Sequence, residues 1–475
     1  MNLKSETSQG DNMKYENDKV TDIKIAYIGG GSRGWAWSFM GDLAFEKNIS
    51  GTIALYDIDK SAAKQNEKLG NMKSTMWKYK AVDSLSQALH DTDFVVISIL
   101  PGTFDEMYSD VHTPERHGIY QSVGDTSGPG GIIRSLRTIP MFVEIAKAIK
   151  EHAPKAWVIN YTNPMSICIK TLYHVFPNIK AFGCCHEVFG TQKVLRDIVQ
   201  KKLGVSNVAR NEIKVNVLGI NHFTWFDYAS YKGVDLFPIY KDFIEENFEK
   251  GHSEKEEHWA NSSFSSMNRV KFDLFRKYGY IAAAGDRHLA EFLPSEIYLK
   301  DPETVAYWKF GLTTVDWRKN DLKERTEKSR KLVTREENLE IKPSGEEGIL
   351  LIKALCGLGG VISNVNMPNS CRQISNLDKN DVVETNALFE RDMIRPVAAG
   401  CLPQNIYKLT IPHIENHNLT LKAALNCDIK LVIEAFKKDP LINNKISEKE
   451  IESLAKDMIK NTIDFLPKEW EKNVC

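Results

Sequence analysis

Residues 23–34 read IKIAYIGGGSRG, and this stretch decides the fold of the chain. The first six residues form a short apolar run of β type, and Gly29, Gly31 and Gly34 then match the spacing G-x-G-x-x-G. In this pattern the first glycine permits a tight turn, the second lets the backbone approach a phosphate, and the third lets the next helix pack on the strand. A helix is expected at residues 35–45. The stretch therefore predicts a Rossmann-type unit with dinucleotide phosphates at the helix N-terminus.

The next expected strand, residues 52–56, ends in Asp57, which follows Gly34 by 23 residues. An acid at about 20 residues from the glycines binds the ribose 2′-hydroxyl, and it favours NAD over NADP because it repels the extra phosphate. Ser32 and Arg33 complete the turn, and we include them in the cofactor site. Pro101 follows a third expected strand, residues 94–100, at the sheet edge where ligands bind. A flexible glycine loop and a plain strand-to-loop turn are the alternatives.

The bulk properties exclude several classes of protein. The 475 residues carry a formal net charge of −1, which gives no global field for nucleic acid. The chain has no apolar run of about 18 residues for a membrane span and no apolar centre of a secretion signal near its start. Eight cysteines are too few for a disulfide scaffold. We therefore expect a cytoplasmic protein that contacts neither nucleic acid nor membrane.

The order of apolar runs predicts an α/β protein with an N-terminal Rossmann-type parallel sheet, followed by a mixed α/β substrate and oligomerisation domain. We expect a disordered tail at 1–21, the dinucleotide-binding domain at 22–190, and the substrate and metal-binding domain at 191–475. Within them we expect helices at 61–78 and 419–436. The Gly/Pro/Asn-rich segment 364–376 is expected to be a loop.

Several polar segments are rich in reactive groups. They are residues 124–131, 160–164, 183–187 and 219–222. Cys185 and His222 offer a thiolate and an imidazole, a ligand pair suited to Mn, Fe, Co, Ni or Zn. The alternative is that Cys185 is inert packing and His222 is a hydrogen-bonded core histidine.

A fifth segment, residues 285–291, reads GDRHLAE and brings three ionisable types together. Asp286 is a candidate general base, and Arg287 is a candidate ligand for an anionic substrate group. A helix start capped by Asp286 explains the same residues without catalysis.

Taken in order, many short pieces of the chain resemble glycoside hydrolase family 4, the NAD- and metal-dependent glycosidases, from about residue 22 to about residue 470. The matching pieces are residues 29–34, 124–131, 134–140, 162–165, 185–188, 221–222, 285–286, 344–346, 366–369, 376–377 and 396–403.

The resemblance implies a hydrolysis outside the usual two-carboxylate scheme. NAD+ takes hydride from C3 of the glycone, a base removes the acidified C2 proton, and the C1 aglycone oxygen is eliminated. Water then adds, and the hydride returns to C3. A divalent metal, expected to be Mn with Co, Ni or Fe as alternatives, holds the C2 and C3 oxygens and stabilises the enediolate charge.

The same resemblance assigns roles to individual residues. Cys185 and His222 match the metal ligands, Asn163 matches the residue that holds the sugar hydroxyls, and Asp286 matches the C2 base of the α-glycosidase branch. His186 and Asp125 compete for the role of general acid.

Residues 185–188, CHEV, resemble the α-galacturonidase branch, whereas α-glucosidase and α-galactosidase members tend to have serine at the position of Glu187. We therefore expect hydrolysis of α-galacturonides, in oligosaccharides or small uronides, with Arg287 as a candidate for the substrate carboxylate. The resemblance also suggests a dimer or tetramer.

Alternatives are an α-glucosidase, α-galactosidase or α-glucuronidase of the same family, a metal-free 2-hydroxy-acid dehydrogenase, and a non-catalytic NAD-binding sensor. Each uses the same dinucleotide turn, so that turn does not separate them.

Overall fold

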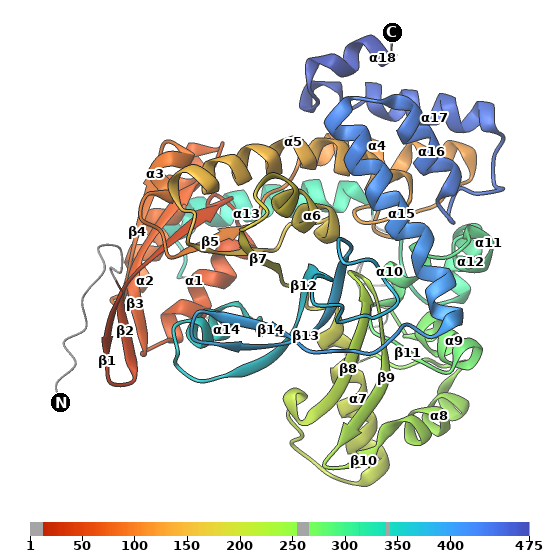
Figure 1. Ribbon diagram of the computed structural model, residues 1–475, viewed down its shortest axis with the longest axis horizontal. Coiled ribbons are helices and arrows are strands. Elements are labelled where there is room, and N and C mark those ends of the chain that lie inside the picture. The colour runs from red at the N-terminus through yellow and green to blue at the C-terminus, as the bar shows by residue number, and fades with distance from the viewer. Residues whose placement is uncertain (1–12, 254–265, 313, 339–342, 475) are drawn as a thin grey trace.

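The computed structural model describes residues 13–253, 266–312, 314–338 and 343–474 (Figure 1). It confirms the α/β class, because a large sheet runs through the molecule with helices packed on it. Six neighbouring strands are parallel, in the spatial order β7-β6-β5-β2-β3-β4. Their bounds are β2 Lys19–Ile28, β3 Ile49–Tyr56, β4 Trp77–Val82, β5 Phe94–Ile97, β6 Trp157–Asn160 and β7 Lys180–Gly183.

The centre of the sheet is buried on both faces. Ile25 and Tyr27 of β2 belong to one apolar cluster, and the alternate residues Ala26 and Ile28 belong to another on the opposite face. Successive side chains of a strand point to opposite faces, so a strand covered on both sides reads as a continuous apolar run. The helices of this half are α1 Trp35–Phe45, α2 Lys60–Lys73, α3 Leu85–Leu89, α4 Phe104–His112, α5 Gly128–His152, α6 Met165–Val175 and α7 Glu187–Leu203. The last of them, α7, packs against a second sheet and not on this one (Figure 1).

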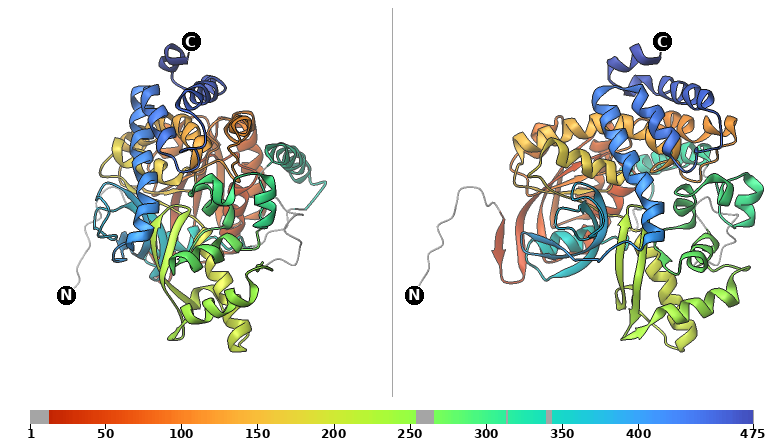
Figure 2. Two further views of the ribbon diagram at one scale, coloured as in Figure 1. Left: turned by 90° about the vertical axis from the view of Figure 1, so that its right-hand side faces the viewer. Right: turned by 45° about the vertical axis from the view of Figure 1, so that its right-hand side comes forward.

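The rest of the chain builds a second sheet and a group of helices (Figures 1 and 2). β8 Ile213–Ile220 and β9 Phe223–Tyr231 form an antiparallel hairpin, and β10 Val234–Asp235 and β11 Ile281–Ala282 also pair with β9. The longer helices are α8 Leu236–Asn247, α9 Arg269–Tyr278, α13 Val315–Thr334, α14 Gly348–Leu355, α15 Gln404–Asn426, α16 Ile429–Lys438 and α17 Glu448–Lys460. Short helices are α10 Asp286–Glu291, α11 Ser295–Tyr298, α12 Pro302–Tyr307 and α18 Glu471–Val474.

Three strands from this second half extend the first sheet. β12 Val361–Pro368 pairs antiparallel with β7, and β13 Val382–Glu390 and β14 Met393–Pro396 follow it. The segment 364–376 was therefore wrongly expected to be a loop throughout, because its first residues pair with β13. The same sheet contains strands from both sides of residue 190, where we expected one domain to end. The domain boundary itself stays a prediction.

Two expectations near the N-terminus are wrong in part. Residues 14–16 form β1, which pairs with the start of β2 at residues 19–21, so the described part of the expected tail is a hairpin. Residues 1–12 lie outside the described residues. The helix expected at 61–78 ends at Lys73, and β4 begins at Trp77. In β4 the buried side chains of Trp77 and Tyr79 alternate with exposed lysines, which is the period of a strand.

The helix expected at 419–436 is two helices. Cys427 has a φ of +50°, a left-handed conformation that ends α15. Asp428 then starts α16 by accepting the Lys430 N–H at 2.9 Å. Within the described residues, no helix is both long enough and apolar enough to cross a membrane.

A buried ion pair joins α4, α5 and the C-terminal helices. The Arg137 guanidinium on α5 donates to Asp110 of α4 at 3.0 and 2.5 Å, and neither side chain is exposed. The same guanidinium donates to the Pro101 carbonyl at 3.3 Å and to the Thr462 hydroxyl at 3.0 Å. Such a pair is costly to break because one charge is left buried alone.

We expect Arg137→Met to lower the free energy of unfolding by about 3–5 kcal/mol, because it strands the Asp110 carboxylate. Arg330→Met is the matched control, since its guanidinium pairs with Glu327 and Glu336 on the surface, where solvent screens ion pairs, and this variant should unfold close to wild type. Urea unfolding followed by circular dichroism measures both. Equal unfolding midpoints for the two variants would show that the buried ion pair stabilises the fold no more than the surface ion pairs do.

Candidate active site

The glycine turn lies where the carboxyl ends of β2, β3 and β5 meet. Gly29 has a φ of +95°, and a Cβ on it would lie 2.0 Å from the Ser98 carbonyl oxygen at the end of β5. Both features exclude a side chain at Gly29. The strand, turn and helix of the predicted dinucleotide site are therefore present.

The other predicted cofactor residues gather around the same turn. One Asp57 carboxylate oxygen accepts the Gly31 N–H at 2.8 Å, and the other accepts the Asp59 N–H at 2.9 Å. Burial raises the pKa of Asp57. The Ser32 hydroxyl accepts the Gly34 N–H at 3.3 Å. Gly34 is the N-cap of α1, so the free N–H groups of that helix begin here.

Arg33 and Pro101 complete the predicted set. The Arg33 side chain is 14% exposed, and its guanidinium lies 4.0 Å from Asp59. Pro101 follows β5 and offers its carbonyl to Arg137. The structure thus brings all the predicted cofactor residues to one edge of the sheet, and their contact with a cofactor stays a proposal.

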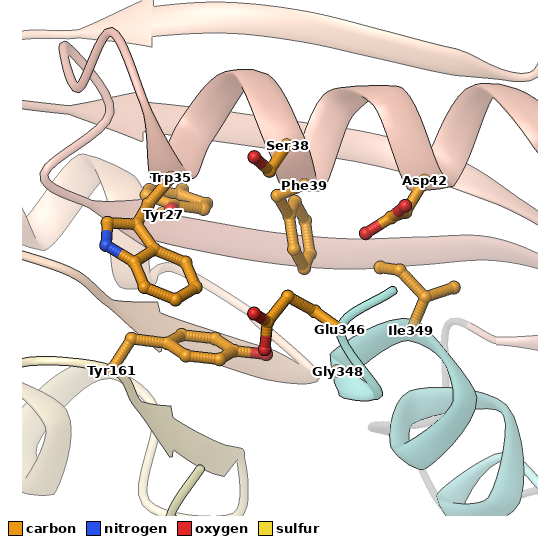
Figure 3. Close-up of a pocket in the computed structure, with 9 residues that line it drawn as sticks. All are labelled: Tyr27, Trp35, Ser38, Phe39, Asp42, Tyr161, Glu346, Gly348 and Ile349. Carbon is orange, nitrogen blue, oxygen red and sulfur yellow. The ribbon is translucent and has the colours of Figure 1, made fainter. Parts of the chain in front are cut away.

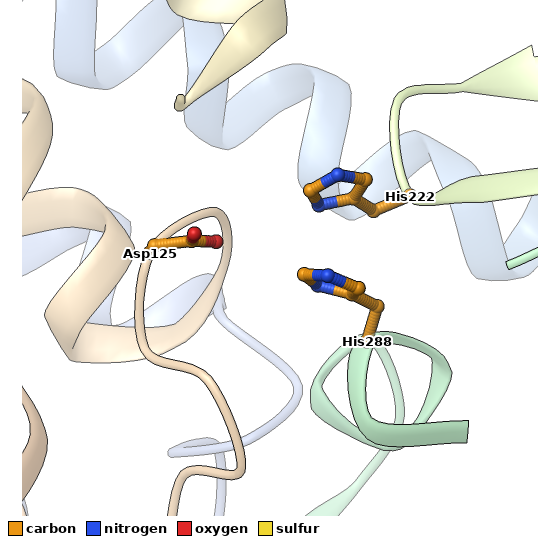
Figure 4. A group of neighbouring side chains, drawn as sticks. All are labelled: Asp125, His222 and His288. Carbon is orange, nitrogen blue, oxygen red and sulfur yellow. The ribbon is translucent and has the colours of Figure 1, made fainter. Parts of the chain in front are cut away.

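A second cluster consists of Asp125, His222 and His288 (Figure 4). One ligand atom from each residue lies within 4.8 Å of the others. Asp125 comes from the loop before α5, His222 from the β8–β9 turn, and His288 from α10. The two imidazole rings face each other with centroids 3.7 Å apart. The cluster joins both halves of the chain.

The β8–β9 turn fixes the orientation of His222. Its two residues are Asn221 and His222, and His222 has a φ of +63°. The Thr126 hydroxyl lies 2.9 Å from His222 Nδ1 and donates to the Asp125 carboxylate at 2.7 Å. A hydroxyl has one hydrogen, so the network assigns the hydrogen of the neutral ring to Nδ1. The lone pair of His222 then lies on Nε2.

The ionisation states in the cluster suit a cation. Burial opposes ionisation of Asp125, but the protonated forms of His288 and His222 together with Arg134 outweigh burial and lower its pKa to about 2. Once the two rings are neutral, Arg134 and the Thr126 hydroxyl remain to stabilise the carboxylate. Burial lowers the pKa of His222 to about 3 and also lowers that of His288. His288 Nδ1 is buried and has no hydrogen-bond partner. One carboxylate and two neutral imidazoles can hold a divalent cation such as Mn, Co, Ni or Zn.

Cys185 lies next to this cluster but is not one of its three members. It precedes α7 and is buried, and its thiol has Asn221 and the backbone of Glu187 as hydrogen-bond partners. Burial raises the pKa of this thiol well above its ordinary value. Its role as a metal ligand stays a prediction.

Asn163 has the free polar atom that a ligand site requires. Its side-chain carbonyl oxygen is buried without a partner, while its backbone carbonyl accepts Arg134 Nε at 3.1 Å. Arg134 is buried and also acts on the charge of Asp125. The Asn163 side chain is therefore available to a hydroxyl group.

Asp286 and Arg287 both have protein partners. The Asp286 carboxylate accepts the backbone N–H groups of Val270 and Lys271, in the first turn of α9, at 3.3 and 3.1 Å. Burial raises the pKa of Asp286 to about 6. Arg287 donates to the carbonyls of Ser122 and Gly311 at 2.5 and 3.2 Å. These contacts fit structural roles, and the assignments as base and carboxylate ligand stay predictions.

His186 and Glu187 form the rim of the site at the start of α7. The His186 side chain is 52% exposed and lies between Glu187 at 3.7 Å and Glu346 at 3.4 Å. Glu187 accepts the Gly285 N–H at 2.6 Å and lies 3.8 Å from His288 Nε2. Burial opposes ionisation of Glu187, but the histidines around it lower its pKa to about 2.

A pocket lies beside this rim, between α1 and the start of α14 (Figure 3). The Trp35 ring stacks on Tyr161 with centroids 5.3 Å apart, and its centroid is 6.0 Å from that of His186. Glu346 also lines the pocket. The aromatic pair thus connects the cofactor helix to the rim.

Sequence reasoning gave no role to His288 or Glu291, although both lie in the quoted segment 285–291. Glu291 is fully buried, and one of its oxygens accepts the N–H groups of Val123 and Gly124 at 2.6 and 2.9 Å. It thereby attaches the loop that carries Asp125 to the helix that carries His288. The sequence signal that could have identified them is the spacing of His288 and Glu291, three residues apart in GDRHLAE, which places both on one side of a helical turn.

The comparisons with known proteins cover nearly the whole chain. Residues 24–201 match the family 4 glycosyl hydrolases, and residues 217–442 match the C-terminal domain of the same family. An α-galacturonidase of Lachnoclostridium phytofermentans is 65% identical over 464 residues, covering 96% of this chain and 100% of that protein. The chain therefore belongs to glycosyl hydrolase family 4.

Two solved structures share the fold. One, from Bacillus subtilis and described as a glucosidase, has a TM-score of 0.89 and 52% identity, covering 92% of this chain and 100% of the other. A 6-phospho-alpha-glucosidase from gut microorganisms, solved with NAD and Mn2+, has a TM-score of 0.79 and 19% identity. That comparison covers 94% of this chain and 99% of the other.

We expect Glu291→Ala to loosen the loop 122–127, because two buried N–H groups lose their acceptor. Amide hydrogen exchange of this loop should become about 10- to 100-fold faster. Glu291→Gln keeps one oxygen acceptor and should stay close to wild type. Glu296→Ala, which removes an exposed carboxylate that pairs with Lys445, is the matched control. Unchanged exchange in Glu291→Ala would refute the role of Glu291 in positioning Asp125.

Proposed function

We propose that this chain hydrolyses α-linked galacturonides with the help of NAD and a divalent metal. The observation that carries the proposal is the 65% identity to an α-galacturonidase over that protein's full length. The CHEV sequence at residues 185–188 supports the same substrate class. Glu187 ties α7 to Gly285 and lies beside His288, so the residue that distinguishes this branch belongs to the site itself.

The residues of the candidate active site fit both NAD and a divalent cation. The glycine turn, Asp57 and the N-terminus of α1 fit NAD, and Asp125, His222 and His288 fit a divalent cation with Cys185 close by. When bound, NAD supplies a hydride acceptor for C3 of the glycone, and the cation supplies a Lewis acid at the neighbouring sugar oxygens. Mn2+ is the cation we expect, because it accepts carboxylate and imidazole ligands and occurs with the same fold in the gut-microorganism enzyme.

The protein side chains orient the glycone around this centre. The unpartnered carbonyl of Asn163 accepts a sugar hydroxyl, and buried Arg134 beside it balances the charge of Asp125. Asp125 and His186 are the two candidates for donating a proton to the leaving oxygen. His186 is at the exposed rim, where an aglycone leaves, whereas Asp125 is ionised at neutral pH. The exposed position of His186 and the ionised state of Asp125 favour His186 as the proton donor.

Abstraction of the C2 proton and recognition of the C6 carboxylate remain assigned to Asp286 and Arg287. Asp286 is raised in pKa to about 6, which suits a base, but its oxygens already accept two N–H groups. Arg287 follows Asp286 directly in the chain, and its guanidinium already donates to two backbone carbonyls. In these roles, Asp286 and Arg287 would have to replace their contacts with the protein backbone by contacts with the substrate.

We also propose that the enzyme works in the cytoplasm as a dimer or tetramer. The seven cysteines among the described residues are all free, which fits a reducing compartment.

The substrate is tested by a screen of α-galacturonide, α-glucuronide, α-glucoside and α-galactoside with NAD+, Mn2+ and a thiol reductant. We expect the α-galacturonide to be hydrolysed at least about 100-fold faster than the neutral galactoside, because a site built to pair a charged group rejects an analogue that lacks it. Faster turnover of a neutral glycoside would refute the uronide assignment. Activity untouched by EDTA would instead favour a metal-free dehydrogenase, and NAD binding without turnover a sensor.

The metal ligands are tested by binding of Mn2+, measured as loss of the free-ion signal in electron paramagnetic resonance. His288→Gln and Cys185→Ser should each weaken binding by at least about 10-fold if the side chain is a ligand. His90→Gln, at a side chain that is 81% exposed, is the control. Affinity within twofold of wild type in either variant removes that residue from the site.

A further inference from the structure

Helix α13 belongs to the C-terminal half but lies along the helices of the N-terminal sheet (Figure 2). Its first residue, Val315, packs with Met107 and Val111 of α4. Near its other end, the Ser329 hydroxyl donates to the Gln65 side chain of α2 at 2.9 Å. The helix is therefore anchored at both ends, and its middle passes the glycine turn.

Arg325 extends from the middle of α13 to that turn. Its Nη1 donates to the Arg33 carbonyl at 3.2 Å, and its Nε donates to Asp321 on the preceding turn of α13 at 2.7 Å. A Cβ built on Gly34 would lie 3.1 Å from the same Nη1. The guanidinium thus lies against the N-cap residue of α1.

A cation is in an unfavourable place at this end of a helix. The N-terminus of α1 carries the positive end of the helix dipole, and its first turn has no acidic residue. Arg33 adds a second guanidinium, and Arg33 Nε is buried without a hydrogen-bond partner. The Arg325 guanidinium and the N–H groups of a helix N-terminus therefore lie together, with the Arg33 side chain on the same glycine turn. That arrangement is stable around a ligand with two negative charges.

We propose that Arg325 is a ligand of the pyrophosphate of NAD, supplied to the Rossmann turn by the C-terminal half of the chain. The inference rests on the proposed function, because it takes NAD as the occupant of the turn. The glycine pattern alone supplies backbone N–H groups to the phosphates, and Arg325 adds a charge-assisted hydrogen bond that a simple βαβ unit lacks.

The same helix connects the two sites. Arg318 lies seven residues before Arg325, about 10 Å along the helix on the same face, and its charge interacts with Asp125. A pyrophosphate held by Arg325 therefore restrains the helix whose Arg318 interacts with Asp125 of the candidate metal cluster. We therefore expect NAD binding to restrain both the glycine turn and the cluster that contains Asp125.

The test is the dissociation constant of NAD+ for the full-length protein, measured by isothermal titration calorimetry without substrate. Arg325→Ala should weaken NAD+ binding by about 10-fold or more, and Arg325→Lys by less, because a single ammonium keeps the charge but loses the planar fork. The matched control is Arg330→Ala on the same helix, whose guanidinium pairs with Glu327 and Glu336, and it should bind NAD+ as wild type does.

Two further ligands separate the phosphate contact from general damage. Adenosine has no phosphate, so it should bind wild type and Arg325→Ala equally, whereas ADP-ribose should show the same loss as NAD+. Competition by inorganic phosphate at millimolar concentration in wild type, without a change in NAD+ affinity in Arg325→Ala, would assign the site to free phosphate and overturn the inference. NAD+ affinity in Arg325→Ala within twofold of wild type would also overturn it. Absence of NAD+ binding in wild type would refute the proposed function and, with it, this inference.

Discussion

The buried carboxyl group of Glu291 is the contact on which the geometry of the active site depends. Asp125 lies on a loop of the N-terminal half, and His222 and His288 lie in the C-terminal half, so their mutual distances are set only if the two halves are held together at this point. Glu291 achieves this with two N–H groups of the loop, and the Ser122 hydroxyl returns a hydrogen bond to the Arg287 carbonyl at 2.5 Å. Burial raises the pKa of Glu291 to about 8, so at neutral pH the group is mainly a neutral carboxylic acid, and one of its oxygens accepts both N–H groups.

Burial also explains the charges of the cluster. It favours the neutral forms of His222 and His288, while the Arg134 guanidinium and the Thr126 hydroxyl stabilise the ionised form of Asp125. Imidazoles bind metals only as neutral rings, and carboxylates only when ionised, so these ionisation states suit the divalent cation proposed for the cluster. The price is a strained turn, since His222 has a left-handed backbone that a non-glycine residue adopts only when its surroundings fix it.

Local patterns predicted the strand, turn and helix around the glycines. The helix expected at 35–45 is found with those bounds, and Gly29, Asp57 and Pro101 meet at one sheet edge because parallel strands end on the same side. The strand β4 was missed because its lysines gave it the charge of a helix surface, and β12 was missed because its Asn and Pro residues are typical of loops. In both, pairing with neighbours in the sheet outweighed local composition.

The metal half depended on contacts that sequence spacing does not contain. His288 follows His222 by 66 residues and Asp125 by 163, so only the packing of α10 against the β8–β9 turn and the loop before α5 brings their rings and carboxylate together. Asp286 was assigned as base from its position in the family pattern, and packing adds what the pattern does not contain: α9 beside it supplies two N–H groups to its oxygens. Its role as base stays a prediction.

The position of Glu187 gives a physical reason for the difference between branches of the family. A carboxylate there cannot itself attract a uronic acid, because like charges repel. It instead lies between His186 and His288 and opposes the effect of burial on His288. A serine at this position would remove the negative charge beside both histidines, and its shorter side chain would not extend as far toward the Gly285 N–H. In the uronide hydrolase proposed above, the charge of Glu187 would therefore act on the substrate through the two histidines beside it, His186 and His288.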